Sequence, residues 1–196
     1  MKKMLLVALS AGMVACGTQK NVENANPMEY AETITASELK EHLYTFASDE
    51  YEGRNTGEPG QKKAAEYIVN EYQEIGIKAP EGYANFYQEI PTKFFDGKLN
   101  DSENVLGFIK GSEKPDEILV ITSHYDHVGV DDEGNIYNGA DDGGSGPVGI
   151  LEIAEAFKAA QKDGYTPKRS ILFIHLTCEE KGLLGSKYYT ENPVMP

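Results

Sequence analysis

Positive charge is scarce in this sequence of 196 residues, which has 18 Lys and Arg residues against 32 Asp and Glu residues. The formal net charge is -14 at pH 7, and no segment gathers enough basic side chains to neutralise a run of phosphates. This composition argues against nucleic acid as a partner. Hydrophobic residues make up 40% of the chain and charged residues 26%, which is typical of a soluble globular domain and disfavours disorder or a fibre.

Cysteine is equally scarce, because the chain has only Cys16 and Cys178. Cys16 follows Lys2, the short apolar run 4–9 and a few small residues, and this segment fits an export signal better than a membrane span. Residues 13–16, Met-Val-Ala-Cys, resemble a bacterial lipobox, in which the cysteine becomes the lipidated first residue of the mature protein. The alternative is an ordinary cleaved signal peptide in which Cys16 is incidental. With Cys16 lipidated, Cys178 has no partner, and we expect no disulfide.

The N-terminal pattern predicts three parts. Residues 1–15 are expected to be a signal peptide, and residues 16–32 a lipidated cysteine followed by a flexible tether, since this stretch is polar and lacks periodicity. Residues 33–196 are expected to form one folded domain. A lipid on Cys16 would anchor the chain at a membrane without spanning it. The expected location is therefore the bacterial cell envelope, on the periplasmic face or at the outer membrane or cell surface.

Apolar periodicity predicts both helices and strands in the folded part. Helical spacing occurs over residues 36–47, 59–75 and 147–162. Apolar runs at 118–121 and 170–176 have the length and β-branched content of buried strands. Because the last helix lies between these two strands, the unit predicts parallel pairing and an α/β fold.

Metal-ligand residue types stand where the two predicted strands end. His124 and Asp126 follow the first strand, and Glu179 and Glu180 follow the second. In open α/β sheets, the crevice beyond the carboxyl ends of the strands is the usual ligand site. A lone His or Asp at a strand end is more often a structural polar residue, but His124, Glu180 and a glycine-flanked Asp141 occur together. The pattern therefore points to a hydrolytic metal centre.

The two adjacent glutamates predict a division of roles. Neighbouring side chains of an extended chain point in opposite directions, so one of Glu179 and Glu180 can ligate an ion while the other is free to act as a general base. A solvated acidic turn is the alternative, which the preceding buried-strand pattern makes less favourable. The glycines around Asp141 permit the sharp backbone geometry that would let its carboxylate bridge two ions, which lie about 3.5–4 Å apart in two-metal hydrolases.

Three motifs, in this order, carry a family resemblance. They are Ser-His-Tyr-Asp-His at 123–127, Asn-Gly-Ala-Asp-Asp-Gly-Gly-Ser-Gly at 138–146 and Glu-Glu-Lys-Gly-Leu-Leu-Gly-Ser at 179–186. The chain resembles the co-catalytic, di-zinc aminopeptidases, the metallopeptidase family of secreted bacterial leucyl aminopeptidase, aminopeptidase S and aminopeptidase Y. Residues 48–60 are also similar to the family's N-terminal region. The resemblance covers about residues 39–186 and implies a three-layer α/β/α sandwich with a mixed, largely parallel central sheet.

On these positions, the resemblance implies a set of roles. His124 would ligate one zinc ion, Asp141 would bridge two ions and Glu180 would ligate the other. Glu179 would be the catalytic general base, and Asp126 would orient His124. The implied activity is release of N-terminal residues from peptide substrates by a zinc-dependent hydrolase. The alternatives are a glutaminyl cyclase, which resembles this family but uses a single zinc, and a non-catalytic lipoprotein fragment that serves as a binding module.

The family pattern also has an Asp and a His ligand downstream of the two glutamates. Residues 187–196 contain no histidine, so the chain is expected to carry three of five ligands and to lack the last part of the sheet, as a C-terminally truncated member.

Five further residues or segments have weaker interpretations. Three histidines are expected outside the catalytic set: His127 on the surface or lining the pocket, His175 inside an apolar strand, and His42 on a helix surface. Cys178 is interpreted as a buried small hydrophobe, and direct metal ligation by it is a remote alternative. The polar segment 48–57 is either a surface connector or a loop near the site that uses its arginine.

Overall fold

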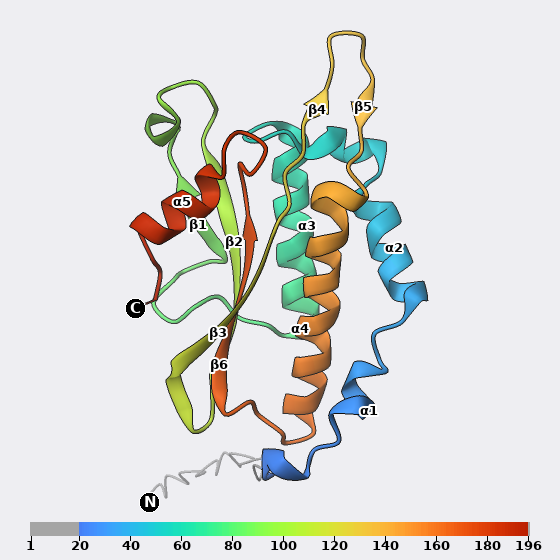
Figure 1. The fold of residues 1–196 in the computed structure, drawn as a ribbon, viewed down its shortest axis with the longest axis vertical. Coiled ribbons are helices and arrows are strands. Elements are labelled where there is room, and N and C mark those ends of the chain that lie inside the picture. Colours follow the sequence, from blue (N-terminus) through green and yellow to red (C-terminus); the bar gives the residue numbers. More distant parts are fainter. Residues whose placement is uncertain (1–19, 196) are drawn as a thin grey trace, which may run out of the picture.

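The computed structural model describes residues 20–195, and Figure 1 shows how their elements are arranged. In chain order, the elements are η1 (Val22–Asn24), α1 (Pro27–Ala31), α2 (Ala36–Phe46), η2 (Asp49–Arg54), α3 (Pro59–Ile75), β1 (Tyr87–Ile90), η3 (Thr92–Phe95), β2 (Ser102–Ile109), β3 (Lys114–His124), β4 (Gly129–Val130), β5 (Ile136–Tyr137), η4 (Asp141–Ser145), α4 (Gly146–Lys162), β6 (Arg169–Leu176) and α5 (Leu184–Glu191). The three predicted helices are confirmed as α2, α3 and α4. The expected signal peptide and Cys16 lie outside the described residues.

Local sequence signals set the ends of two of these helices. Thr35 caps α2, because its hydroxyl accepts a hydrogen bond from the Glu38 backbone N–H at 3.2 Å. α3 ends at Gly76, whose φ of 85° lies in the left-handed region that glycine adopts without a steric penalty. Within residues 20–195, the structure contains no helix that is both long and apolar enough to cross a membrane.

Four strands form one mixed sheet in the order β1-β2-β6-β3. β3 and β6 pair in parallel, as the strand, helix, strand pattern predicts, whereas β1–β2 and β2–β6 are antiparallel. The α/β fold and the mixed sheet are therefore confirmed. The expectation of a largely parallel sheet is not met within the described strands, because two of the three strand pairings, β1–β2 and β2–β6, are antiparallel.

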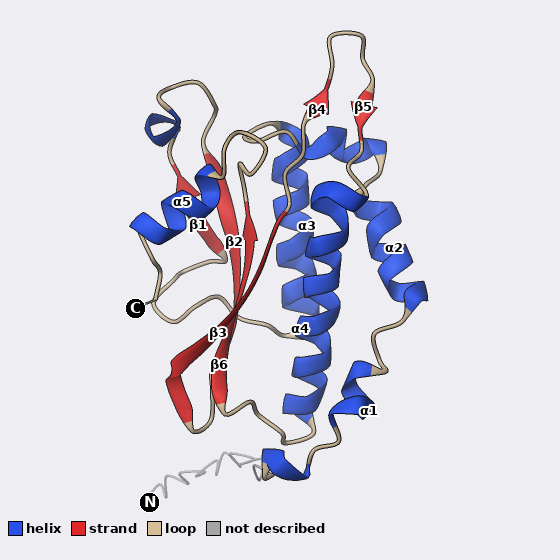
Figure 2. Cartoon of the chain, viewed as in Figure 1, coloured by secondary structure: helices blue, strands red, loops and turns tan. Residues whose placement is uncertain are grey.

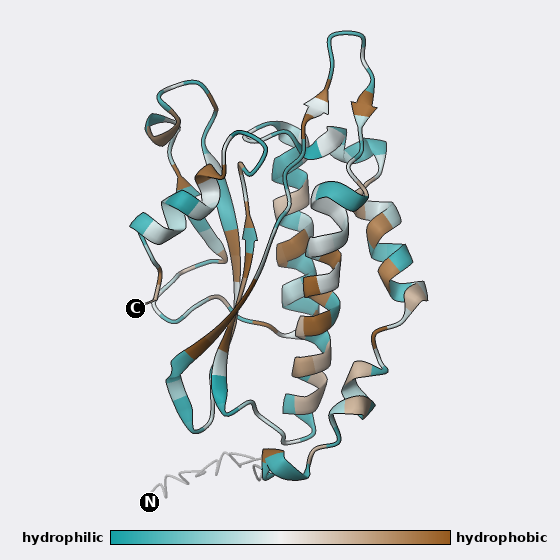
Figure 3. Ribbon diagram, viewed as in Figure 1, coloured by the Kyte–Doolittle hydropathy of each residue, from teal (hydrophilic) through white to brown (hydrophobic). Residues whose placement is uncertain are grey.

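Helices cover both faces of this sheet, which gives the predicted three layers (Figures 1 and 2). α3 and α4 pack on one face, where Ile68, Val105, Leu151 and Phe173 belong to the main core. α5 lies against the other face, where Tyr189 packs on a smaller apolar cluster from β2 and β6. Figure 3 shows apolar residues along the middle of the strands and on α3 and α4. Both layers are held mainly by burial of these apolar faces.

β3 lies at the edge of the sheet rather than in its interior. Leu119 and Val120 are 50% and 47% exposed, so the expectation of a buried strand at residues 118–121 is wrong. The physical reason is that β3 has a hydrogen-bonded neighbour, β6, on one side only. β6 itself lies between two strands and is buried from Ser170 to His175, as its apolar run predicts.

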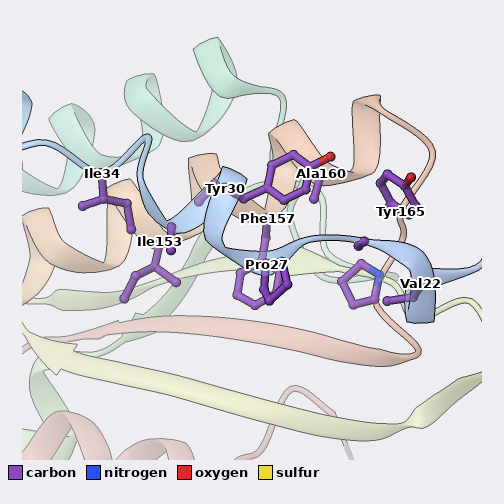
Figure 4. A pocket seen from close by; sticks show the side chains of 12 residues that line it. Val22, Pro27, Tyr30, Ile34, Ile153, Phe157, Ala160 and Tyr165 are labelled. Atoms are coloured by element: carbon purple, nitrogen blue, oxygen red, sulfur yellow. The ribbon is translucent and has the colours of Figure 1, made fainter.

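The described part of the expected tether is folded. α1 contacts α4, and the Tyr30 hydroxyl donates a hydrogen bond to Asp163, just after the end of α4, at 3.0 Å. This differs from the flexible tether predicted over residues 16–32. The polar residues of the folded segment face solvent, whereas Val22 and Ala25 face α4. A cavity of about 270 Å³ remains between this N-terminal segment and α4 (Figure 4). Its lining is Val22, Ala25, Pro27, Tyr30, Ala31, Ile34, Ile153, Ala156, Phe157, Ala160, Tyr165 and Pro167.

Candidate metal centre

The carboxyl ends of β3 and β6 bring the predicted site residues to one edge of the sheet. His124 pairs with Leu176 in the parallel register, so the residues that follow both strands emerge side by side. η4 starts at this same end of the molecule, beneath the β4–β5 hairpin (Figure 1). Two segments that are far apart in the sequence and one glycine-rich turn therefore meet at the site.

Asp126 is fully buried and joins three parts of the site. Its Oδ1 accepts a hydrogen bond from the Glu179 backbone N–H at 3.0 Å, and its Oδ2 accepts one from the Thr56 hydroxyl at 2.9 Å. The His124 Nδ1 atom lies 3.2 Å from the Asp126 carbonyl oxygen and 3.7 Å from Oδ1. Hydrogen bonding to Asp126 is the main cause that raises the pKa of His124. This geometry suits the predicted orienting role, because a fixed Nδ1 leaves Nε2 free for a ligand.

The Asp142 carboxylate lies at the centre of the ligand-type side chains. Its Oδ1 is 3.0 Å from Nε2 of His124. His127, Asp142 and Glu180 also each offer one ligand atom, and these atoms all lie within 4.8 Å of one another. Nδ1 of His127 is 2.9 Å from Oε1 of Glu180. The surface position favoured for His127 is therefore wrong, since its side chain is only 15% exposed and faces the cluster.

The structure places Asp142, rather than the predicted Asp141, among these side chains. Asp142 has φ -88° and ψ 110° and Gly143 has φ 77°, so the chain reverses within η4 and turns the Asp142 side chain toward His124. A Cβ on Gly143 would collide with the Asp126 carbonyl oxygen, which explains why glycine is required at this turn. Asp141 is exposed and is not part of the cluster found among the described residues. Adjacent aspartates cannot be told apart without these dihedral angles.

Glu179 and Glu180 face different neighbours, as their adjacency predicts. Glu180 contacts His127, whereas Glu179 lines a cavity of about 70 Å³ with His124, Leu176, Thr177, Leu183 and Ser186. The backbone turns at Cys178, which has φ 59° and is fully buried, as expected for a small apolar side chain. Burial raises the pKa of the Cys178 thiol to about 11, so it stays protonated at neutral pH and is a poor metal ligand.

The remaining two histidines lie apart from this cluster. His175 is buried, and its Nε2 lies 2.7 Å from the Tyr72 hydroxyl, which confirms the structural interpretation. The expectation of a surface position for His42 is wrong. Its ring packs between helices, with Nδ1 2.5 Å from the Tyr67 hydroxyl and Nε2 3.5 Å from Glu152.

Residues 48–57 lie beside the site, which decides between the two interpretations of this segment. Thr56 holds Asp126, and the Arg54 guanidinium is fully buried behind the loops that carry the ligand-type residues. The role of Thr56 was not predicted. The available sequence signal was Glu-Gly-Arg at 52–54. It was not sufficient, because a charged residue beside a glycine in a polar segment does not by itself indicate burial.

The donor set fits a divalent transition metal. His124, His127, Asp142 and Glu180 offer neutral imidazole nitrogens and carboxylate oxygens, which are the ligand types that Zn²⁺ takes in catalytic sites. The close approach of carboxylates to one another is unfavourable by itself, and a cation between them would relieve it. Asp142 is common to both groupings, since it lies 3.0 Å from His124 and offers a ligand atom within 4.8 Å of those of His127 and Glu180.

Residues 104–195 match the model of Peptidase family M28. Among curated relatives, the aminopeptidase YwaD of Bacillus subtilis is 34% identical over 120 residues, which are 60% of this chain and 24% of that protein. The probable glutamate carboxypeptidase LAMP1 of Arabidopsis thaliana is 36% identical over 89 residues, which are 45% of this chain and 12% of that protein. The chain thus spans a quarter or less of the length of these curated relatives.

Solved structures share the fold. A Zn-dependent exopeptidase from Parabacteroides distasonis superposes with a TM-score of 0.62 at 20% identity, covering 83% of this chain and 57% of that one. A glutaminyl cyclase from Porphyromonas gingivalis superposes with a TM-score of 0.65 at 18% identity, covering 82% of this chain and 56% of that one. At these identities, the similarity establishes the fold alone.

Proposed function

We propose that this chain, whose residues 104–195 match the model of Peptidase family M28, supplies the metal site and general base of a zinc-dependent aminopeptidase, which removes N-terminal residues from peptides. The observation that carries the proposal is the convergence of His127, Asp142 and Glu180, with His124 3.0 Å from Asp142, at the carboxyl ends of two parallel strands. An arrangement of imidazoles around a shared carboxylate suits zinc and the hydrolysis of an amide bond.

Four side chains would hold zinc in this proposal: His124, His127, Asp142 and Glu180. Two ions are proposed, for which His124 and Asp142 would offer ligand atoms 3.0 Å apart, and His127, Asp142 and Glu180 would offer atoms within 4.8 Å of one another. Bound zinc supplies a Lewis acid that polarises a scissile carbonyl group and lowers the pKa of a water molecule. The remaining chemistry rests on the protein's own residues.

Glu179 is the proposed general base. It lines the small cavity beside His124, and its backbone N–H is fixed by the buried Asp126 carboxylate at 3.0 Å. From there, its carboxylate can take a proton from the attacking water and pass it to the leaving amine. Asp126 has a positioning role, because it contacts the backbone of Glu179 and the ring of His124 rather than the substrate.

The first test is the zinc content of the purified chain, followed by Glu179→Gln. We expect the variant to keep the wild-type zinc content and to lose aminopeptidase turnover by about 100- to 10,000-fold, the usual contribution of a general base. Glu191→Gln, at the exposed end of α5, is the control and should leave turnover unchanged. Turnover by Glu179→Gln at the wild-type rate would remove Glu179 from this role.

The same assay separates the alternative functions. Formation of pyroglutamate from peptides with an N-terminal glutamine, at one zinc per chain, would identify a glutaminyl cyclase. Zinc binding with neither hydrolysis nor cyclisation would indicate a binding module. A chain that is folded but takes up no zinc would refute the metal site proposed for these residues.

We also propose a lipid anchor on Cys16 and a location at the bacterial cell envelope, on the basis of the lipobox-like sequence at residues 13–16. Labelling with a radioactive fatty acid in a bacterial host should modify the wild-type chain but not Cys16→Ser. Equal labelling of both proteins would exclude Cys16 as the acceptor.

A further inference from the structure

Arg54 is a buried charge that the proposed reaction does not use. Its side chain is 0% exposed, and its guanidinium donates hydrogen bonds to the carbonyl oxygens of Tyr125 at 2.9 Å, Asn138 at 2.8 Å and Gly139 at 2.8 Å. A fourth bond, at 3.0 Å, reaches the Phe46 carbonyl at the end of α2, and the guanidinium also lies over the Phe46 ring. All four acceptors are uncharged. Burying this charge is costly, and the cost is offset by these four hydrogen bonds and by attraction to the nearby carboxylates of Asp126 and Asp142.

Three of the four acceptors of Arg54 belong to the two loops that carry the proposed ligands His124, His127 and Asp142. Tyr125 lies next to His124, at the end of β3. Gly139 lies in the loop just before η4, three residues ahead of Asp142. The Arg54 carbonyl oxygen also accepts a hydrogen bond from the backbone N–H of His127 at 3.1 Å. One residue thus connects the histidine loop to the aspartate loop.

The backbone around Arg54 is shaped for this contact. Glu52, Gly53 and Arg54 have φ values of 51°, 62° and 50°, all in the left-handed region, and two of the three are not glycine. Such conformations are unfavourable and tend to cluster where function requires them. A Cβ on Gly53 would lie 2.5 Å from the carbonyl oxygen of Gly129 and 2.6 Å from that of Tyr137. The segment is therefore pressed against the base of the β4–β5 hairpin, between the two ligand loops.

We propose that Arg54 is a positioning residue that holds the histidine loop and the aspartate loop at the separation that zinc binding requires. Its planar fork of N–H groups can reach several carbonyls in fixed directions, whereas a lysine ammonium presents its donors from one point. The inference rests on the proposed metal site and adds a residue that does not itself contact metal or substrate. The site would then be preformed before the metal binds.

The test compares zinc affinity, the visible absorption of bound Co²⁺ and thermal unfolding for wild type, Arg54→Lys and Tyr72→Phe. Tyr72→Phe is the matched control, because it removes a buried hydrogen bond to His175 in the core, away from the ligands. We expect Arg54→Lys to weaken zinc binding by about 10- to 100-fold, as loss of a group that orients ligands usually does, and to change the Co²⁺ spectrum. Tyr72→Phe should lower the melting temperature and leave both metal readouts unchanged.

Two results would overturn the inference in different ways. Folded Arg54→Lys with wild-type zinc affinity and Co²⁺ spectrum would show that Arg54 only stabilises the fold. Wild type without zinc binding would refute the metal site and the positioning role together. If Arg54→Lys does not fold, hydrogen exchange of wild type decides. Backbone amides of residues 124–127 and 138–142 should be equally protected with and without zinc, and protection that appears only with zinc would contradict a preformed site.

Discussion

The two ends of α4 differ in how their surroundings are built. At the N-terminal end, η4 carries Asp142 into a set of polar side chains whose partners are individually defined by distances of about 3 Å. At the C-terminal end, α1 covers the helix through apolar contacts and leaves a cavity of about 270 Å³ (Figure 4). Directional contacts tolerate little change in geometry, whereas apolar burial depends on area and tolerates imperfect packing. Single substitutions should therefore have larger effects at the N-terminal end.

The largest effect is expected for Asp142→Asn. Removing this carboxylate takes away the group between the proposed ions, so zinc affinity should fall by more than the roughly 100-fold typical of an outer hydrogen-bond partner. Asp141→Asn is the matched control, because it makes the same chemical change at the adjacent, exposed position. Competition with a chelator measures both affinities. Equal losses of zinc affinity in the two variants would contradict the proposal that Asp142, and not Asp141, is a ligand.

Gly53→Ala comes next and probes the segment behind the ligand loops. The new methyl group would collide with two carbonyl oxygens and force a left-handed alanine, which should reduce the free energy of unfolding by about 2–4 kcal/mol. Gly134→Ala shares the positive φ, but no atom lies within 4 Å of the added Cβ, so it should cost only about 1 kcal/mol. Urea unfolding measures both values. A Gly134 loss as large as that at Gly53 would mean that φ alone, and not close packing, explains the effect.

A smaller effect is expected from acid, through the core pair of His175 and Tyr72 on the sheet face below the site. Burial lowers the pKa of His175 to about 3, below the unfolded value near 6.5. The folded state therefore favours the neutral ring, and its contribution to stability is complete above about pH 6.5 and is lost as the pH falls toward 3. Between pH 6.5 and 5, the unfolding free energy should decrease by about 1–2 kcal/mol.

His175→Gln isolates this contribution, because the variant lacks the titrating ring but retains the other histidines. Denaturant unfolding at several pH values should show a shallower decline for the variant than for wild type. The difference between the two curves is the relevant quantity, since it cancels the titration of His124, whose pKa is shifted in the opposite direction. Parallel curves would contradict the buried neutral state of His175.

The smallest effect belongs to the apolar end of α4. Ala160→Leu should place new methyl groups in the cavity and raise the unfolding free energy by about 1 kcal/mol, after the side-chain entropy loss is deducted from the burial gain. Ala159→Leu makes the same change one position away, outside the cavity lining, and should have little effect. Thermal unfolding of both variants checks this. Destabilisation by Ala160→Leu would show that the cavity wall is rigid.

Much of the fold could be predicted from periodicity. The apolar stripes of α2, α3 and α4 and the β6 run predicted those elements to within a residue or two at each end, and the order strand, helix, strand predicted that β3 and β6 are parallel. The exposure of Leu119 in β3 could not be predicted. An apolar run indicates that a strand contributes to the core. It does not indicate how many strands lie beside it, because strand order in the sheet is a non-local property.

The site was predicted in its location and less well in its members. His124, Asp126, Glu179 and Glu180 all come together where the strand ends predict, because parallel strands place their carboxyl ends at one edge. Asp141 was assigned the bridging role, and His127 was assigned to the surface. The first difference arises in a turn, where left-handed Gly143 follows Asp142, and the second arises because His127 forms a β-bridge with Asn55, a residue distant in sequence.

The sequence by itself determined the element types, the parallel unit and the chemical character of the site, because periodicity and residue type are local properties that survive any arrangement of the chain. The tertiary structure decided which aspartate faces the histidines, which strand forms the edge, that the segment before α2 packs on α4, and that Arg54 is buried. These outcomes depend on dihedral angles at single glycines and on contacts between segments distant in sequence. Neither quantity is encoded in the pattern of any one segment.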